Sequence, residues 1–234
     1  MAPGAAGTAS FDDVWVIIPV YNEAQVIAGV VEGVLPVFRN VVCVDDGSRD
    51  TSAERIFHTR AHLVSHPVNL GQGAALQTGL EYALLQPGAE YFVTFDADGQ
   101  HRVEDAADLV RAVKDGDADV ALGSRFLETP EQVPWLKHIL LKAVALMSPS
   151  ARQLRLTDAH NGLRVFNRAA AASLKITMNG MAHASEIVAY LSRSQLSVTE
   201  VPVTVLYTDY SKAKGQSLIN GVNILFDLSL RTRR

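Results

Sequence analysis

The stretch YFVTFDADGQH at residues 91–101 joins an apolar run to a cluster of polar side chains. The β-branched and aromatic residues of Tyr91–Phe95 predict a buried strand. Asp96 and Asp98 follow at once, and Gly99 allows a turn. Two carboxylates one residue apart at a strand end suit a hard cation such as Mg²⁺ or Mn²⁺, and also a ribose hydroxyl. The plainer alternative is a turn with two solvated Asp side chains.

The same order, an apolar run followed by polar residues, recurs elsewhere in the chain. It is found at Val14–Ile18 before PVYNE, at Val41–Val44 before DDGS, and at Val120–Leu122 before GSR. His62–Ser65 adds a further short strand. The segments between these strands predict four helices. One covers 27–35, one begins near residue 50, one ends at residue 85 and one covers 104–114. This alternation predicts a Rossmann-like, mostly parallel α/β sheet flanked by helices, with ligands at the carboxyl ends of its strands.

Two local signals refine this reading. Asn22 with Gln25 three residues later is typical of a helix N-cap, so a helix is expected to start there. Gly71 and Gly73 lack the third glycine of a dinucleotide fingerprint, and they follow the third strand rather than the first. They therefore predict a tight turn that opens a helix.

The second half of the chain is less regular. Residues 133–147 predict an amphipathic helix, and 158–166 predict a loop that runs into a strand. A helix over about 182–193 and a strand at Val201–Leu206 follow. Residues 220–230 form a second amphipathic pattern with a basic end. These helices either touch a membrane surface or cover the sheet.

The predicted organisation is a flexible tail at 1–12 and a single domain at 13–234. Within that domain, residues 13–125 form a first half with the regular strand and helix pattern, and 126–234 a second, less regular half. The chain has 234 residues, 48% of them apolar, with a net charge of −4. It can bury a large core, and its charge argues against a nucleic-acid partner. One Cys excludes a disulfide framework. No apolar run spans a membrane and no leader pattern is visible, which predicts a cytoplasmic protein.

The polar residues at the strand ends suggest a nucleotide site. Asp45 and Asp46 offer acceptors to a base or a ribose, and Tyr21 offers a face for stacking. The plainer alternatives are a turn with a helix cap at Asp45–Ser48 and an ordinary core or rim position for Tyr21. The basic residues that could meet phosphate are Arg125, Arg164, Lys212 and Lys214. Each of these side chains taken alone is more often an ordinary surface charge. The histidines lack the spacing of metal ligands, so none is assigned to a metal.

Taken together, the motifs PVYNE, DDGS, DADGQH and GSRF resemble those of the family 2 glycosyltransferases of the GT-A fold, especially the dolichyl- and polyprenyl-phosphate mannose or glucose synthases. Asp158 followed by NGLR resembles a further stretch of that branch. The resemblance implies a donor site, metal ligands and phosphate contacts. The donor residues would be Pro19, Tyr21, Glu23, Asp45, Asp46 and Asp96. Asp96, Asp98 and Gln100 would hold the metal, with Arg125 and Arg164 at phosphate.

The expected function is a metal-dependent, inverting transfer of a hexose from GDP-mannose or a UDP-sugar to a polyprenyl phosphate, at the cytoplasmic face of a membrane. Asp96, Asp98, Arg125 and Asp158 are the expected catalytic residues. One alternative keeps the donor chemistry but uses a hydroxyl acceptor, with Asp158 as the base and Glu186 as second choice. Another alternative is a non-catalytic nucleotide-sugar-binding protein. The sequence leaves the oligomeric state open.

Overall fold

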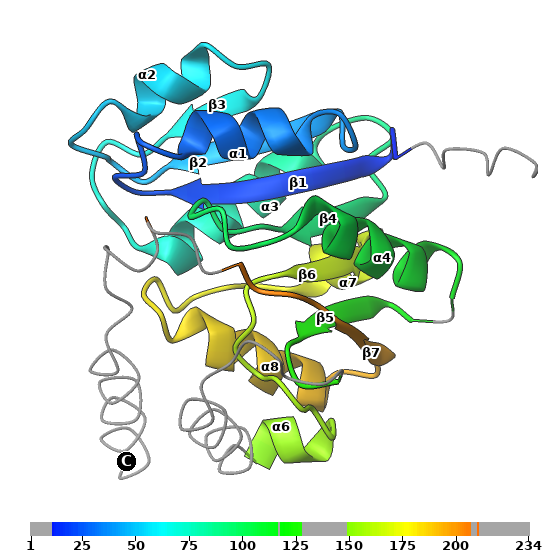
Figure 1. Ribbon diagram of the computed structural model, residues 1–234. Coiled ribbons are helices and arrows are strands. Elements are labelled where there is room, and N and C mark those ends of the chain that lie inside the picture. The colour runs from blue at the N-terminus through cyan, green and yellow to red at the C-terminus, as the bar shows by residue number, and fades with distance from the viewer. Residues whose placement is uncertain (1–10, 117, 128–148, 207–209, 211–234) are drawn as a thin grey trace, which may run out of the picture.

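The computed structural model describes residues 11–116, 118–127, 149–206 and 210 (Figure 1). Its seven strands form one sheet in the order β3-β2-β1-β4-β6-β5-β7. They are β1 Val14–Val20, β2 Asn40–Asp45, β3 His62–Ser65, β4 Tyr91–Thr94, β5 Val120–Ser124, β6 Arg164–Asn167 and β7 Val198–Pro202. Only β6 runs antiparallel to its neighbours β4 and β5, and all other pairs are parallel. The predicted Rossmann-like, mostly parallel sheet is therefore confirmed.

Helices cover both faces of the sheet. The helices are α1 Ile27–Val34, α2 Ser52–Phe57, α3 Gln72–Leu84, α4 Val103–Lys114, α6 Pro149–Gln153, α7 Arg168–Ser173 and α8 His183–Arg193. Side chains of α1, α2 and α4 share one apolar cluster, and those of α3, α7 and α8 share another. In β1, Val16 and Ile18 enter the first cluster while Trp15 and Ile17 enter the second. Such strict alternation is what a strand buried between two helical layers requires.

Two predicted element boundaries are wrong. Helix α1 begins at Ile27, not at Asn22, which adopts a left-handed backbone with φ of 55°. Asn tolerates this conformation, and its side chain accepts a hydrogen bond from the backbone N–H of Arg49 at 2.8 Å instead of capping a helix. Strand β7 ends at Pro202 because its partner β5 ends at the paired Ser124. The chain beyond Pro202 leaves the sheet.

Gly71 and Gly73 open α3, as predicted, and they also permit a close approach by another segment. Gly71 has φ of 102°, and a Cβ there would lie 2.3 Å from the carbonyl oxygen of Asn179. A Cβ on Gly73 would lie 2.1 Å from the carbonyl oxygen of Met178. The backbone N–H of Gly73 donates to Asn179 at 2.7 Å. The start of α3 and the segment before α8 are thus packed backbone against backbone.

Several predictions lie outside the described residues. These are the amphipathic helices at 133–147 and 220–230, the side chains of Lys212 and Lys214, and residues 1–10 of the predicted tail. Among the helices that are described, none is long and apolar enough to cross a bilayer.

Replacing Gly73 with Ala should destabilise the fold. The added methyl group would force the Met178 carbonyl away and lower the free energy of unfolding by roughly 1–3 kcal/mol. Gly33→Ala is the matched control, because Gly33 is exposed in α1 and a Cβ there meets nothing within 4 Å. That substitution should raise the free energy of unfolding by roughly 0.5–1 kcal/mol. Urea denaturation measures both, and equal stabilities would contradict the packing argument.

Candidate active site

The carboxyl ends of β2, β1 and β4 bring the acidic motifs to one edge of the sheet. β1 pairs with β2 on one side and with β4 on the other, so the segments that follow the three strands are neighbours. The backbone N–H of Asn22 donates to the Ser48 hydroxyl at 2.9 Å, and that of Glu23 donates to the Ser52 hydroxyl at 2.8 Å. The PVYNE loop is thereby bonded to the last residue of DDGS and to the start of α2. Tyr21 stays 39% exposed beside it.

Asp45 and Asp46 are adjacent in sequence but have different surroundings. Asp46 accepts from the backbone N–H groups of Leu70 at 2.9 Å and Gly71 at 2.7 Å, and it contacts His66 Nδ1 at 2.7 Å. Its carboxylate therefore holds the loop that leads into α3. Asp45 Oδ1 is buried with no hydrogen-bond partner among the described residues. A buried, unpaired acceptor costs roughly 1–3 kcal/mol, which a ligand donor would recover. Asp45 is thus the better candidate for contacting a nucleoside.

Asp96 is held in place by its neighbours. Its Oδ2 lies 2.9 Å from His101 Nε2, and its Oδ1 accepts from Gln72 Nε2 at 3.2 Å. Burial opposes its ionisation, but the hydrogen bond and charge of His101, with the charge of Arg164, outweigh that cost and lower the pKa of Asp96. Asp96 therefore remains a carboxylate at neutral pH.

Asp98 has the opposite shift. Burial raises the pKa of its carboxyl, and the negative charge of Asp96 raises it further. The backbone N–H of Gln100, which donates to Asp98 Oδ1 at 3.0 Å, only partly offsets this. Two crowded carboxylates of this kind are stabilised by a cation between them.

The residues present fit a divalent cation shared with a substrate. Asp96 and Asp98 supply carboxylate oxygens, and the side chain of Gln100 adds a neutral oxygen nearby in the chain. In the described ranges, no group of three or more His, Cys, Asp or Glu side chains is arranged to hold a metal ion. Mg²⁺ and Mn²⁺ are often bound by one or two carboxylates and completed by phosphate oxygens and water, so this incomplete set suits such an ion.

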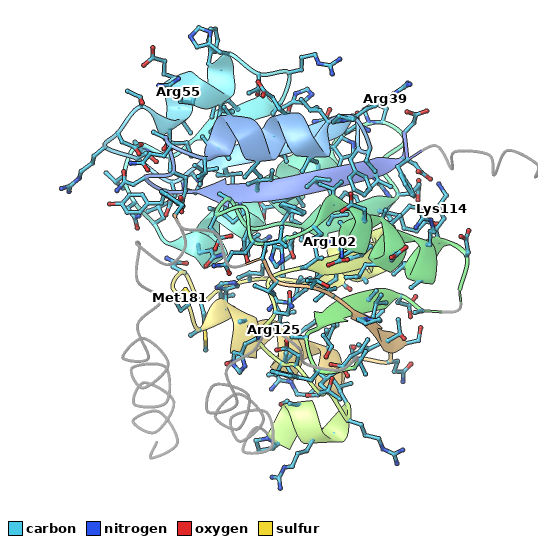
Figure 2. The ribbon with its side chains drawn as sticks, in the orientation of Figure 1. Arg39, Arg55, Arg102, Lys114, Arg125 and Met181 are labelled. Atoms are coloured by element: carbon cyan, nitrogen blue, oxygen red, sulfur yellow. The ribbon has the colours of Figure 1, made fainter. Side chains whose placement is uncertain are left out.

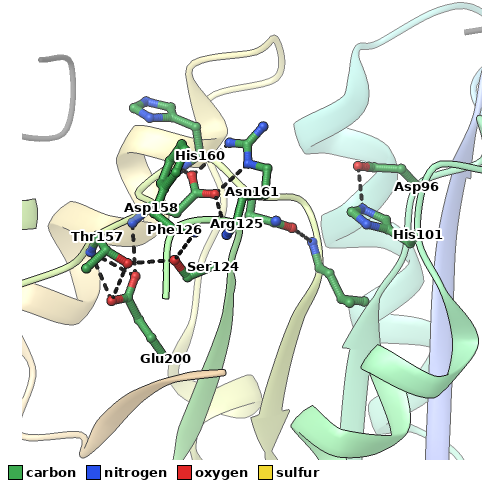
Figure 3. A network of polar contacts seen from close by, with 11 residues as sticks. Asp96, His101, Ser124, Arg125, Phe126, Thr157, Asp158, His160, Asn161 and Glu200 are labelled. Carbon is green, nitrogen blue, oxygen red and sulfur yellow. Dashed lines mark hydrogen bonds and ion pairs between the residues drawn. The ribbon is translucent and has the colours of Figure 1, made fainter. Parts of the chain in front are cut away.

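On the other side of the site, Arg125 and Asp158 form a two-point ion pair (Figure 3). Arg125 Nε donates to Asp158 Oδ2 at 2.6 Å, and Nη2 donates to Oδ1 at 2.8 Å. The Asp158 side chain is 2% exposed. Burial would raise its pKa, but the hydrogen bonds and charge of Arg125 dominate and lower it. Figure 2 places Arg39 and Arg55 at the periphery around α1 and α2, well away from Arg125.

Glu200 and Thr157 support this pair, and the sequence analysis missed both. Glu200, on β7, accepts the backbone N–H of Thr157 at 2.9 Å with each oxygen, and that of Asp158 at 3.0 Å. The Thr157 hydroxyl also lies 2.6 Å from the Ser124 hydroxyl (Figure 3). Glu200 stands 42 residues from Asp158. No local pattern connects residues that far apart, so only the folded sheet reveals the contact.

Arg164 and Asn161 lie between these two groups. Arg164 is 2% exposed on β6, where it pairs with Thr94 of β4 and Leu122 of β5. Burial lowers its pKa, and the charges of Asp96 and Asp158 oppose that effect. Within the described part of the chain, Arg164 Nη1 and Asn161 Nδ2 have no hydrogen-bond partner although both are buried. Two unpaired donors, one of them charged, are suited to an anion.

Glu186 and two histidines complete the surroundings. Glu186 accepts the backbone N–H groups of Thr177 at 3.0 Å and Met178 at 2.9 Å, so it holds the segment before α8. His183 Nδ1 donates to the Gly180 carbonyl at 2.9 Å. Burial and the charge of Arg164 lower the pKa of both His160 and His183. Both histidines are therefore neutral at pH 7.

Residues 15–174 match the model of the glycosyl transferase family 2. The chain belongs to that family. It is 28% identical, over 92% of its length and 94% of the relative's, to the UDP-N-acetylglucosamine–dolichyl-phosphate N-acetylglucosaminyltransferase of Methanococcus voltae. It is 30% identical, over 89% of its length and 82% of the relative's, to the polyprenol monophosphomannose synthase of Mycolicibacterium smegmatis. The chain is accordingly a nucleotide-sugar-dependent hexosyltransferase, and a non-catalytic binder is no longer favoured.

The fold also matches that of a solved glycosyltransferase. The glucosyl-3-phosphoglycerate synthase of Mycobacterium tuberculosis, in complex with Mn²⁺ and UDP-glucose, superposes with a TM-score of 0.69. The match covers 94% of this chain and 79% of that one, at 18% identity. The predicted GT-A fold is thus confirmed.

The ion pair predicts an acid-dependent part of the stability. Because the pKa of Asp158 is lowered in the folded state, its stabilising effect is complete above its unfolded pKa of about 3.9 and is lost as the pH falls through the folded value. Asp158→Asn should therefore be least stable relative to wild type near neutral pH. The difference in unfolding free energy should shrink from about pH 5 to pH 3. Urea unfolding across this range measures it, and a constant difference would refute the assignment.

Proposed function

We propose that this chain is a metal-dependent, inverting glycosyltransferase that moves a hexose from a nucleotide sugar to a polyprenyl phosphate. The observation that carries the proposal is the pair of buried, unpaired donors on Arg164 and Asn161 between the acidic edge and the Arg125–Asp158 pair. The printed names of two relatives support it, since one uses a dolichyl phosphate and the other makes a polyprenol monophosphomannose.

The donor occupies the acidic edge of the sheet. Pro19, Tyr21 and Glu23 wall the nucleoside, Asp45 accepts from the base through its unpaired Oδ1, and Asp96 lies near the ribose. Asp46 contributes to the donor site indirectly, because its oxygens accept hydrogen bonds from Leu70 and Gly71 and so hold the loop there. The donor is a UDP-sugar or GDP-mannose.

Asp96, Asp98 and Gln100 hold the Mg²⁺ or Mn²⁺ ion. The glycosyltransferase structure with Mn²⁺ and UDP-glucose shows that this fold accommodates such an ion together with a nucleotide sugar. When bound, the ion neutralises charge on the departing diphosphate. Protein residues supply the rest: Asp96 stays ionised beside His101, and Gln72 fixes its orientation.

The acceptor phosphate lies on Arg164 and Asn161, close to Arg125. A phosphomonoester has a second pKa near 6, so it is already an anion at neutral pH and needs no general base. The enzyme must hold it in line with the anomeric carbon and screen the two sets of phosphates from each other. Lys212 and Lys214 are proposed to assist, although they lie outside the described residues.

A hydroxyl acceptor remains the second candidate, with Asp158 or Glu186 as base. Asp158 has both oxygens held by Arg125 and a lowered pKa, which makes it a weak base. Glu186 is committed to the backbone of Thr177 and Met178. With a hydroxyl acceptor, Asp158→Asn would abolish turnover while donor binding remains. With a phosphate acceptor the loss should be milder.

The proposed location is the cytoplasmic face of a membrane, where a polyprenyl phosphate would be reached. Membrane contact would come from the amphipathic segments at 133–147 and 220–230, both outside the described residues. The organisation into a donor half at 13–125 and an acceptor half at 126–234 is part of this proposal.

A transfer assay tests the whole proposal. Purified protein is supplied with Mg²⁺ or Mn²⁺, a polyprenyl phosphate, and labelled GDP-mannose, UDP-glucose or UDP-N-acetylglucosamine in turn. We expect one of the donors to give labelled product that extracts into organic solvent. A chelator should abolish the formation of this product. Donor hydrolysis without lipid-linked label would instead move the assignment to a hydroxyl acceptor.

Asp98→Asn should reduce transfer on the order of 100-fold or more, because it removes a carboxylate from the cation. Asp108→Asn is the matched control: Asp108 is an exposed carboxylate on α4, and its replacement should leave turnover unchanged. Initial rates at saturating donor and acceptor compare the two variants. Full activity of the Asp98→Asn variant would show that Asp98 is not required to bind the cation.

Asn161→Asp should raise the acceptor KM by about tenfold or more, while the donor KM stays within about twofold. The substitution keeps the oxygen that accepts the Leu163 N–H at 2.9 Å, but replaces an unpaired donor with a negative charge facing the phosphate. Gln195→Glu, at an exposed position after α8, makes the same change in net charge and should change neither KM. An unaltered acceptor KM in Asn161→Asp would place the phosphate elsewhere.

A further inference from the structure

The segment that leaves β7 crosses the proposed metal loop. The backbone N–H of Val203 donates to the Ser124 carbonyl at 3.0 Å, and that of Leu206 donates to the Gln100 carbonyl at 2.8 Å. Val205 forms a β-bridge with His101. The backbone of Thr204 also donates to an Asp105 carboxylate oxygen at 2.7 Å. Four consecutive residues are thus tied to the two ends of the active site and to α4.

Tyr210 is a second contact of the C-terminal part of the chain, and it lies on the donor side. Its hydroxyl donates to Glu23 Oε2 at 2.6 Å, a contact between residues 187 positions apart. Burial raises the pKa of Tyr210, and the hydrogen bond to Glu23 with the charges of Glu23, Asp50 and Asp98 raises it further. The phenol therefore stays protonated at every physiological pH and always acts as the donor in this pair.

Glu23 is a buried carboxylate in an acidic surrounding. Its backbone is held by Ser52 at 2.8 Å, and its charge acts on Asp98. A carboxylate in such a place needs a donor to set its orientation and to offset part of its charge. The Tyr210 hydroxyl meets both needs, and it comes from the opposite end of the chain.

We infer that Tyr210 is a positioning residue for the nucleotide donor, acting through Glu23. The inference rests on the proposed function, because Glu23 is placed there at the nucleoside. By orienting the Glu23 carboxylate before the donor arrives, Tyr210 lowers the cost of ordering the site when the nucleotide binds. Residues 203–206, which precede Tyr210 in the sequence, are themselves bonded to Ser124, Asp105 and the metal loop.

The test compares Tyr210→Phe with Tyr82→Phe in the full chain. Tyr82 is the matched control, since its hydroxyl also makes one hydrogen bond, to His62 Nδ1 at 2.9 Å, on the α3 side of the sheet. Calorimetric titration with UDP and with GDP, in the presence of Mg²⁺, should show about tenfold weaker binding for Tyr210→Phe only. The donor KM should rise similarly, with kcat and the acceptor KM unchanged.

A double variant tests the route of the effect. If Tyr210 acts through Glu23, then Tyr210→Phe should add nothing to the loss of nucleotide affinity caused by Glu23→Gln. Additive losses would show that Tyr210 acts otherwise, and unchanged affinity in Tyr210→Phe would overturn the inference. Either result leaves the proposed function standing if wild type still binds nucleotide. Failure of wild type to bind UDP or GDP would overturn both.

Discussion

Arg164 lies on β6, the antiparallel strand between β4 and β5, and its side chain is almost completely buried. A buried cation is costly unless negative charge surrounds it. Asp96 on one side and Asp158 on the other supply that charge. Neither satisfies Nη1, so the fold keeps one charged donor available inside the site. The two halves of the site therefore share the positive charge of Arg164, and an anion bound there would be attracted by a charge that the protein has already desolvated.

The acidic edge of the sheet follows a related rule. Parallel strands end at one edge, so Asp45, Asp46, Asp96 and Asp98 collect there, and the charge of Asp96 raises the pKa of Asp98. The structure offsets part of this repulsion internally: Asp46 is saturated by backbone N–H groups, and Asp96 by His101 and Gln72. Asp45 and Asp98 are left less satisfied. These are the positions where a nucleoside and a cation would be stabilising.

Local patterns predicted much of the sheet because strands such as β1 and β2 are short, apolar runs rich in β-branched residues, which favour a buried strand. The two wrong element boundaries lie where contacts with residues distant in the sequence determine the local structure. Asn22 looks like a cap until Arg49 is seen to donate to it, and β7 shifts because β5 has already ended. Nothing in the sequence around Glu200 indicates its role in the site, since its partners lie more than 40 residues away. For the same reason, the two Asp residues of DDGS could not be told apart before the His66–Gly71 loop was placed.

β7 and the residues just after it contact both halves of the site. Glu200, within it, orients the turn that presents Asp158 to Arg125. Leu206, just beyond β7, donates to the Gln100 carbonyl, and Tyr210 donates to Glu23. β7 lies at the edge of the sheet and its residues are only partly buried, so its position depends on β5 more than on core packing. A displacement of β7 against β5 would therefore alter the acceptor turn and the metal loop together, because Glu200 in β7 bonds to the turn and Leu206, just after β7, bonds to the loop.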